Sequence, residues 1–158
     1  MKRRNVGFTV LAAVFAACLS SCMSTAERRI DSAYVMVYDY YDGGLMGVSV
    51  FIDEVLAGET DIYGRLMIPV KDGKDKRMVR VEKEGHETVR TETLLRPKQL
   101  LYFKMGSGVY YAECAEKFLD ENKIDKARKM IDKALEIENR KDWLFLKEVI
   151  LGKEKGDE

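Results

Sequence analysis

The feature that most constrains the fold is a change of hydrophobic periodicity at Gly106-Ser107-Gly108. Before this point, apolar and polar residues alternate in short segments, as at Val48, Val50 and Ile52, which is the period of a half-buried β-strand. After it, apolar residues recur three and four positions apart, which is the period of an amphipathic helix. A run of strands followed by a run of helices predicts the α+β class.

Seven short segments between residues 33 and 105 have the pattern of strands, with turn signals every ~8–12 residues. These segments are Tyr34–Tyr38, Val48–Ile52, Glu59–Asp61, Leu66–Val70, Val79–Glu82, Thr88–Thr93 and Leu100–Met105. The Thr88–Thr93 segment is polar, as expected of an edge strand. Together they predict a small antiparallel β-sandwich over residues 33–105.

Three stretches of this region resemble the carboxypeptidase regulatory-like and PEGA β-sandwich modules. Gly47–Asp53, Gly58–Leu66 and Val81–Glu87 carry the G-V-x-V, T-D-x-x-G and V-x-K-x-G-Y patterns of those modules in the same order, with His86 in place of the usual Tyr. The resemblance implies a prealbumin-like sandwich that is an accessory module of enzymes, transporters or surface anchors. It implies no catalytic chemistry.

Residues 109–152 predict two packed helices and a third, capping helix. The apolar positions of the first two are Tyr111, Cys114, Ala115, Phe118, Ala127, Ile131, Ala134 and Leu135. This pattern resembles a single tetratricopeptide unit, although Asn122 and Asn139 stand where Gly and Pro are common. One unit cannot form the groove of a stacked array, so we expect it to pack on the sandwich, on a partner or on the third helix. Residues 153–158 are expected to be a disordered tail.

The first 22 residues have the pattern of a bacterial lipoprotein signal peptide. Lys2, Arg3 and Arg4 precede an apolar run that is too short for a permanent transmembrane helix, and the run ends at Leu19-Ser20-Ser21-Cys22. These four residues resemble the lipobox, which implies an acylated Cys22 and a membrane anchor. Cys18 is a second candidate for the acylated residue, and ordinary secretion is the alternative. Residues 23–32 are expected to form a flexible tether.

Composition narrows the classes of partner and chemistry. Lys and Arg together number 27, as do Asp and Glu, and no basic stripe suggests nucleic acid as a partner. Once Cys18 and Cys22 are removed or acylated, Cys114 is the remaining cysteine, so no internal disulfide is expected. We expect Cys114 to face the helical core.

The sequence predicts neither a catalytic site nor a metal or cofactor site. His86 is the single histidine and lies in a predicted turn, where an exposed role is expected rather than a nucleophilic pair. Asp39, Asp42, Asp53 and Asp61 offer calcium ligands, but solvated turn carboxylates are the simpler interpretation. Glu59 and Asp61 lack the cleft that glycoside hydrolysis needs.

Five aromatic residues are the candidate binding surface. Tyr38, Tyr40, Tyr41 and Tyr63 lie near predicted loops, where tyrosines bind sugars or peptides, although some are expected in the sandwich core. Trp143 is expected to cap the helical pair or to anchor a partner.

We therefore predict a non-enzymatic lipoprotein of the cell envelope, at the outer membrane or the periplasmic face of the inner membrane. Its function is predicted to be protein binding or scaffolding, with the helices as the contact surface and another envelope protein as the partner. The alternative is a lipoprotein that binds glycan or peptidoglycan through the sandwich tyrosines. A third interpretation is an accessory subunit of an envelope enzyme or transporter.

Overall fold

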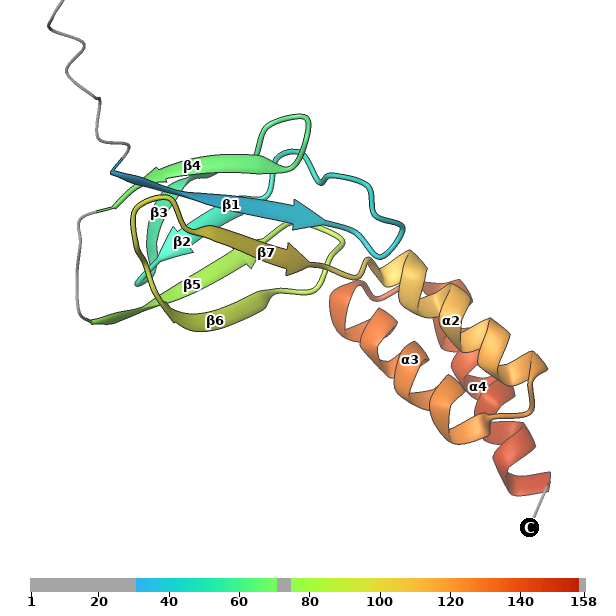
Figure 1. Cartoon of the computed structure of the whole chain (residues 1–158). Coiled ribbons are helices and arrows are strands. Elements are labelled where there is room, and N and C mark those ends of the chain that lie inside the picture. The colour runs from blue at the N-terminus through green and yellow to red at the C-terminus, as the bar shows by residue number, and fades with distance from the viewer. Residues whose placement is uncertain (1–30, 71–74, 157–158) are drawn as a thin grey trace, which may run out of the picture. The chain divides into compact units, whose positions relative to one another are not determined.

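The computed structural model describes residues 31–70 and 75–156, which form two β-sheets followed by three helices (Figure 1). The strands are β1 Ser32–Tyr38, β2 Ser49–Ile52, β3 Val55–Glu59, β4 Arg65–Pro69, β5 Lys76–Glu82, β6 Val89–Leu94 and β7 Leu100–Lys104. The α+β class and the seven-stranded sandwich are thus confirmed. The predicted leader and Cys22 lie outside the described residues.

The strands pair as one three-stranded sheet, in the order β4-β1-β7, and one four-stranded sheet, in the order β3-β2-β5-β6. Figure 1 looks onto the three-stranded sheet, with β1 between its two neighbours. All pairs are antiparallel except β1 with β7, which is parallel over Tyr34–Tyr38 and Leu100–Lys104. A parallel pair requires a long crossover, and here the crossover includes the whole second sheet.

The third strand differs in position from the sequence prediction, which placed it at Glu59–Asp61. β3 runs from Val55 to Glu59, and Asp61 belongs to the turn that follows. One carboxylate oxygen of Asp61 accepts hydrogen bonds from the backbone N–H groups of Tyr63 and Arg65, each at 2.9 Å. This Asx-type turn competes with strand formation at Asp61.

The sandwich core lies between the two sheets and is formed by the inward-facing apolar side chains of the strands. Its main members are Ala33, Val35, Val37, Val48, Val50, Ile68, Val79, Val81, Phe103 and Met105. These positions follow the period of two along β1, β2 and β5. The alternation that predicted the strands therefore also predicts which face of each is buried.

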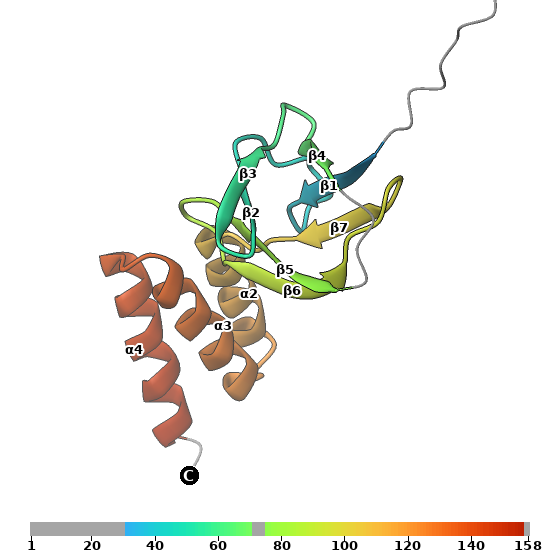
Figure 2. The same cartoon turned by 90° about the vertical axis from the view of Figure 1, so that its left-hand side faces the viewer.

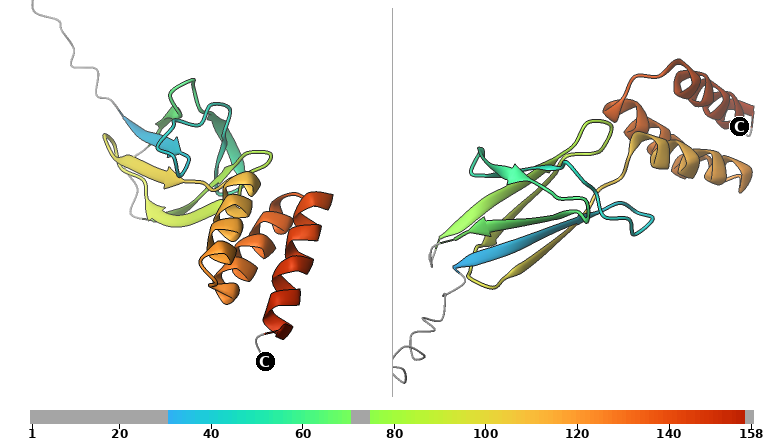
Figure 3. Two further views of the ribbon diagram at one scale, coloured as in Figure 1. Left: turned by 90° about the vertical axis from the view of Figure 1, so that its right-hand side faces the viewer. Right: turned by 90° about the horizontal axis from the view of Figure 1, so that it is seen from above.

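Three helices follow β7: α2 Gly108–Asp120, α3 Ile124–Ile137 and α4 Lys141–Gly156. We call them the helical unit. The Ser107 side chain caps α2 by accepting a hydrogen bond from the Tyr110 N–H at 3.1 Å. Figures 2 and 3 show α3 between α2 and α4. The sequence predicts that the third helix ends at Gly152, but α4 continues to Gly156. Gly152 does not adopt the positive φ that would end the helix.

The helical unit has an apolar core of its own. Its buried members are Tyr111, Ala112, Ala115, Leu119, Ala127, Ile131, Ala134, Trp143 and Ile150. The small residues Ala127 and Ala134 let α2 and α3 approach closely, as expected. Gly108 makes room for Trp143, because a Cβ atom at Gly108 would lie 2.6 Å from the Trp143 Cη2 atom.

Candidate binding surfaces

The segment that links the sandwich to the helical unit is held by hydrogen bonds to the β5–β6 turn. The Glu87 carboxylate accepts from the Gly106 N–H at 2.8 Å and from the Tyr111 hydroxyl at 2.6 Å. The Glu87 N–H donates to the Gly106 carbonyl at 2.9 Å, and the Gly108 N–H donates to the Gly85 carbonyl at 3.1 Å. The helical unit therefore packs on the end of the sandwich, which is one of the arrangements that the sequence left open.

Four tyrosines reinforce this junction, and we call them the tyrosine cluster. Tyr40 and Tyr41 come from the β1–β2 loop, and Tyr110 and Tyr111 come from the first turn of α2. The Tyr40 and Tyr110 rings stack with centroids 4.7 Å apart and planes 8° apart. Tyr41 stands edge-on to Tyr110 at 5.6 Å. These are the favoured geometries of aromatic pairs, so the cluster stabilises the contact between the sandwich and α2.

The surroundings of Tyr41, Tyr110 and Tyr111 raise the pKa values of their hydroxyl groups. Burial, followed by the hydrogen bond to Glu87, raises the pKa of Tyr111 well above its ordinary value. The hydrogen bond to Glu113 raises the pKa of Tyr41 to about 12. An interaction with the Cys114 thiol is the largest of the causes that raise the pKa of Tyr110. At neutral pH these three phenols are protonated and can donate hydrogen bonds.

The four predicted tyrosines do not form one platform. Tyr40 and Tyr41 lie together in the cluster, whereas Tyr38 is half-buried and stacks on Tyr102 at 6.4 Å between ring centroids. Tyr63 is 58% exposed, and the Arg65 guanidinium lies 5.1 Å from the centre of its ring. Among the described residues, no ring contact joins Tyr63 to the other tyrosines.

Two further residues occupy places that bear on the predicted surface. Trp143 is only 5% exposed and belongs to the core of the helical unit, with the Arg140 guanidinium 4.6 Å from its ring centre. A side chain this buried has little surface to offer a partner. Cys114, expected in the helical core, is instead half-buried beside Tyr110 and Tyr41 on the cluster side of α2.

The outer face of the three-stranded sheet carries mostly apolar side chains, a surface that the sequence pattern did not predict. We call it the apolar sheet face: Tyr34, Met36 and Tyr38 of β1, Met67 of β4, and Leu100 and Tyr102 of β7. Tyr102, Met67 and Leu100 are 63%, 58% and 44% exposed. The register places Tyr34 between Met67 and Leu100, and Met36 beside Tyr102. The signal in the sequence was the unbroken apolar run Tyr34–Tyr38, which gives β1 two apolar faces instead of one.

A second exposed apolar surface lies on α4. Phe145, Leu144 and Val149 are 68%, 44% and 37% exposed, and we call them the α4 face. Trp143 and Ile150 attach the opposite side of the helix to the core. Two ion pairs also hold α4 on α3, Lys147 with Asp132 at 2.6 Å and Arg128 with Glu154 at 3.2 Å. The α4 face is therefore presented on a fixed helix.

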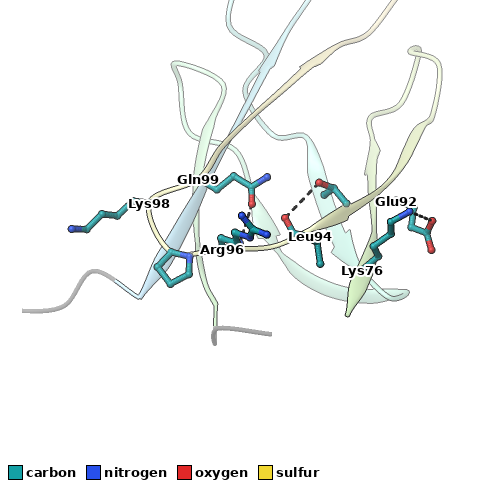
Figure 4. Close-up of a pocket in the computed structure, with 8 residues that line it drawn as sticks. Lys76, Glu92, Leu94, Arg96, Lys98 and Gln99 are labelled. Carbon is teal, nitrogen blue, oxygen red and sulfur yellow. Dashed lines mark hydrogen bonds and ion pairs between the residues drawn. The ribbon is translucent and has the colours of Figure 1, made fainter. Parts of the chain in front are cut away.

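An open pocket of about 610 Å³ lies beside the connection from β6 to β7 (Figure 4). Its charged and polar lining groups already contact one another. Lys76 pairs with Glu92 at 3.5 Å, and the Gln99 side-chain oxygen accepts from the Arg96 N–H at 2.9 Å. Figure 4 shows Lys98 pointing away from these pairs. Leu94 and Pro97 contribute apolar surface, but the pocket is open and Lys76, Glu92 and Gln99 already have partners within it, so we assign it no ligand.

The carboxylates considered as metal ligands are occupied by turns and ion pairs. One Asp39 oxygen accepts from the N–H groups of Tyr41 and Gly43, each at 2.8 Å, and Asp42 pairs with Lys104 at 2.6 Å. Asp53 accepts from the Met78 N–H at 2.8 Å and pairs with Arg77. Within residues 31–70 and 75–156, no three His, Cys, Asp or Glu side chains are grouped as metal ligands would be.

The His86 Nδ1 atom lies 3.1 Å from the Glu84 carbonyl oxygen, in the turn that bridges to Ser107. The bridge to Ser107 gives this turn a backbone contact with the linker. None of the helices in the described part of the chain has the length and apolar character needed to cross a membrane.

Comparisons with known proteins give distant structural similarities. No protein-family model and no curated protein matches the sequence. A chain of a type II cohesin–X-dockerin complex from Acetivibrio cellulolyticus is similar with a TM-score of 0.41 and 17% identity, over 49% of this chain and 58% of that one. The shaft pilin SpaA from Lactobacillus rhamnosus GG has a TM-score of 0.38 and 12% identity, over 48% of each chain. The C-terminal domain of the Caf1A usher has a TM-score of 0.31 and 9% identity, over 48% of this chain and 94% of that one. These proteins share with this chain a small β-sandwich, and their likeness carries no information on what this chain binds.

Proposed function

We propose that this protein is a lipid-anchored module of the bacterial cell envelope that binds another protein through the α4 face and catalyses no reaction. The observation that carries this proposal is the α4 face itself, three exposed apolar side chains on a fixed helix. The anchor rests on the lipobox-like Leu19–Cys22. Two or three acyl chains on Cys22 hold a protein stably at a bilayer, whereas a single chain binds reversibly.

The size of the α4 face indicates a moderate contribution of apolar burial to the free energy of binding. Fully burying an apolar side chain contributes about 1.5–3 kcal/mol, and the exposed fractions of Phe145, Leu144 and Val149 amount to one and a half side chains. A partner that covers them gains about 2–4 kcal/mol from apolar burial. Polar contacts around the rim must supply the rest of the affinity. An amphipathic helix of the partner, laid beside α4, is the simplest complement.

The chemistry of the described residues supports a non-catalytic role. The phenols of Tyr41 and Tyr111 have raised pKa values, and Asp39, Asp42 and Asp53 are bound in turns and ion pairs. One face of the Tyr40 ring is covered by Tyr110, which favours the protein-binding proposal over a glycan platform at Tyr40 and Tyr41.

Photo-crosslinking in cells tests the protein-binding proposal. A photoreactive amino acid is placed at Phe145, and the matched control carries it at Val55 of β3, which is 70% exposed against 68% for Phe145. We expect one discrete adduct from position 145, and we expect it to disappear when Leu144 and Val149 are also changed to Ser. The proposal fails if position 145 gives no adduct, or only those that position 55 gives.

The anchor is tested separately by labelling cells with a fatty-acid analogue. We expect the wild-type protein to take up the label and the Cys22→Ser variant to lose it. A Cys22→Ser protein that keeps the label contradicts acylation at this residue.

A further inference from the structure

We infer that the apolar sheet face lies against the headgroup region of the membrane that holds the anchor, and that it prefers a bilayer containing anionic lipid. The inference rests on the proposed acylation of Cys22 and concerns a different surface from the α4 face. It assigns to the sandwich a second, reversible contact with the membrane.

The side chains of this face suit the boundary between lipid headgroups and acyl chains. Tyr34, Tyr38 and Tyr102 each have an apolar ring and a polar hydroxyl, the combination that concentrates at membrane interfaces. Met67 and Leu100 add apolar surface on both sides of Tyr34. These residues spread over three strands of one sheet, so their side chains present a broad surface and not a pocket, which suits a planar bilayer.

The charge on this face complements an anionic surface. β1, β4 and β7 contain no aspartate or glutamate, although these residues number 27 in the whole chain. The strands carry two cations, Arg65 and Lys104. The Lys98 N–H donates to the Ser32 carbonyl at 2.8 Å, which places Lys98 beside the start of β1. The Lys98 side chain is exposed. Lys104 pairs with Asp42, so Arg65 and Lys98 remain for lipid phosphates.

The position of the face along the chain keeps it close to the bilayer. β1 begins at Ser32, ten residues after Cys22, and ten extended residues span at most ~36 Å. Tyr34 and Leu100 lie at the end of the sheet where the chain enters it. A short tether of this kind holds the face near the membrane at an effective concentration of about 1 mM, so a weak contact is sufficient.

Two cations set the expected strength of the contact. Each Lys or Arg close to an anionic membrane favours the bound state about fivefold, so Arg65 and Lys98 together favour it about 25-fold. A face that the membrane covers for most of the time is accessible to a soluble reagent for only a small fraction of the time. A covered side chain keeps part of its access to a small reagent, so the slowing is smaller than this factor, and we expect a side chain on the face to react about tenfold more slowly on anionic vesicles than in buffer.

Methionine oxidation measures this coverage with an internal control. Met67 lies on the apolar sheet face and is 58% exposed, and Met46 lies in the β1–β2 loop and is 57% exposed. The acylated protein, bound to vesicles of phosphatidylcholine and phosphatidylglycerol, is treated with hydrogen peroxide, and peptide mass spectrometry gives the two oxidation rates. The unacylated Cys22→Ser protein in buffer gives the reference ratio.

We expect the oxidation of Met67 to slow about tenfold relative to that of Met46 on the anionic vesicles. The Arg65→Glu, Lys98→Glu double variant should lose this protection, and the Lys126→Glu, Lys129→Glu variant on α3 should keep it. The inference is overturned if the Met67 to Met46 ratio on vesicles equals that in buffer, or if Met67 is protected only after another envelope protein is added.

The mass of the N-terminal peptide separates the two proposals. An acylated protein with unprotected Met67 overturns this inference and leaves the anchor intact. A protein without acyl chains on Cys22 overturns both.

Discussion

Removal of the Tyr111 hydroxyl tests whether the junction contributes to the stability of the helical unit. In the Tyr111→Phe variant the ring and its edge-on contacts with Tyr40 and Tyr110 remain, but the 2.6 Å hydrogen bond to the Glu87 carboxylate is lost. Tyr111 is 4% exposed, so water does not readily replace the missing donor. A hydrogen bond to a charged group contributes about 1.5–3 kcal/mol, and we expect a loss of about 2 kcal/mol in the free energy of unfolding.

Tyr41→Phe is the matched control, because it also removes a hydroxyl that donates to a glutamate. Tyr41 is 63% exposed, so water can hydrogen-bond Glu113 when the phenol is absent. We expect a loss of about 0.5 kcal/mol or less, as for other exposed interactions of charged groups. The two variants therefore differ in the burial of the bond and little in its chemistry.

Urea unfolding followed by tryptophan fluorescence is the assay. Trp143 is the single tryptophan and lies in the core of the helical unit, so its signal reports that unit. With a slope of about 2 kcal/mol per molar urea, Tyr111→Phe should lower the midpoint by about 1 M. Equal midpoints for Tyr111→Phe and Tyr41→Phe would refute the role of the buried hydrogen bond in holding the junction.

Two further predictions concern a pKa and a turn. Glu113→Gln should lower the pKa of Tyr41 from about 12 toward its ordinary value of 10.0, as followed by NMR titration, since the bond to Glu113 is the largest cause of the raised pKa. Because that pKa is raised, the contribution of this bond to stability is present below pH 10.0 and is lost as the pH rises through about 12. Gly64→Ala should lower the free energy of unfolding by at least about 3 kcal/mol, since it combines backbone strain with a Cβ atom 2.3 Å from the Val37 carbonyl oxygen. Gly85→Ala, at the same φ of 73° but with open space around it, should lose only about 1 kcal/mol in urea unfolding followed by circular dichroism of the strands, and equal losses for the two would contradict the crowding at Gly64.

The parts of the fold that depend on local pattern could be predicted from the sequence. Alternation along Val48–Ile52 and Leu66–Val70 gave strands with the correct buried face, and the helical period after Gly108 gave the helices. The pairing of β1 with β7 could not be predicted in this way, because it joins residues more than sixty positions apart and depends on tertiary packing, which local pattern does not encode.

The surfaces were harder to predict than the fold. Tyr40 and Tyr41 were identified as exposed binding residues, but their contacts with Tyr110 depend on where the helical unit packs, which no local pattern encodes. Cys114 lies on the boundary of the apolar stripe of α2, so a small rotation of the helix decides whether it faces the core or the cluster. The apolar sheet face was visible in the Tyr34–Tyr38 run, but β-propensity alone does not distinguish a strand with one buried face from a strand with two apolar faces.

The parallel pairing of β1 with β7 also determines how the sandwich responds to mechanical load. β1 is the first strand and β7 the last, and the two are parallel neighbours. Opposing forces applied at Asp31 and at Gly108 therefore pull β1 and β7 along their lengths in opposite directions. The backbone hydrogen bonds between the two strands then carry the force together and break in shear, not one after another as in an unzipping hairpin. The ladder runs from the pair Tyr34 and Leu100 to the pair Tyr38 and Lys104. A protein held at one end by lipid and at the other by a partner would thus transmit tension through the most resistant direction of its sheet.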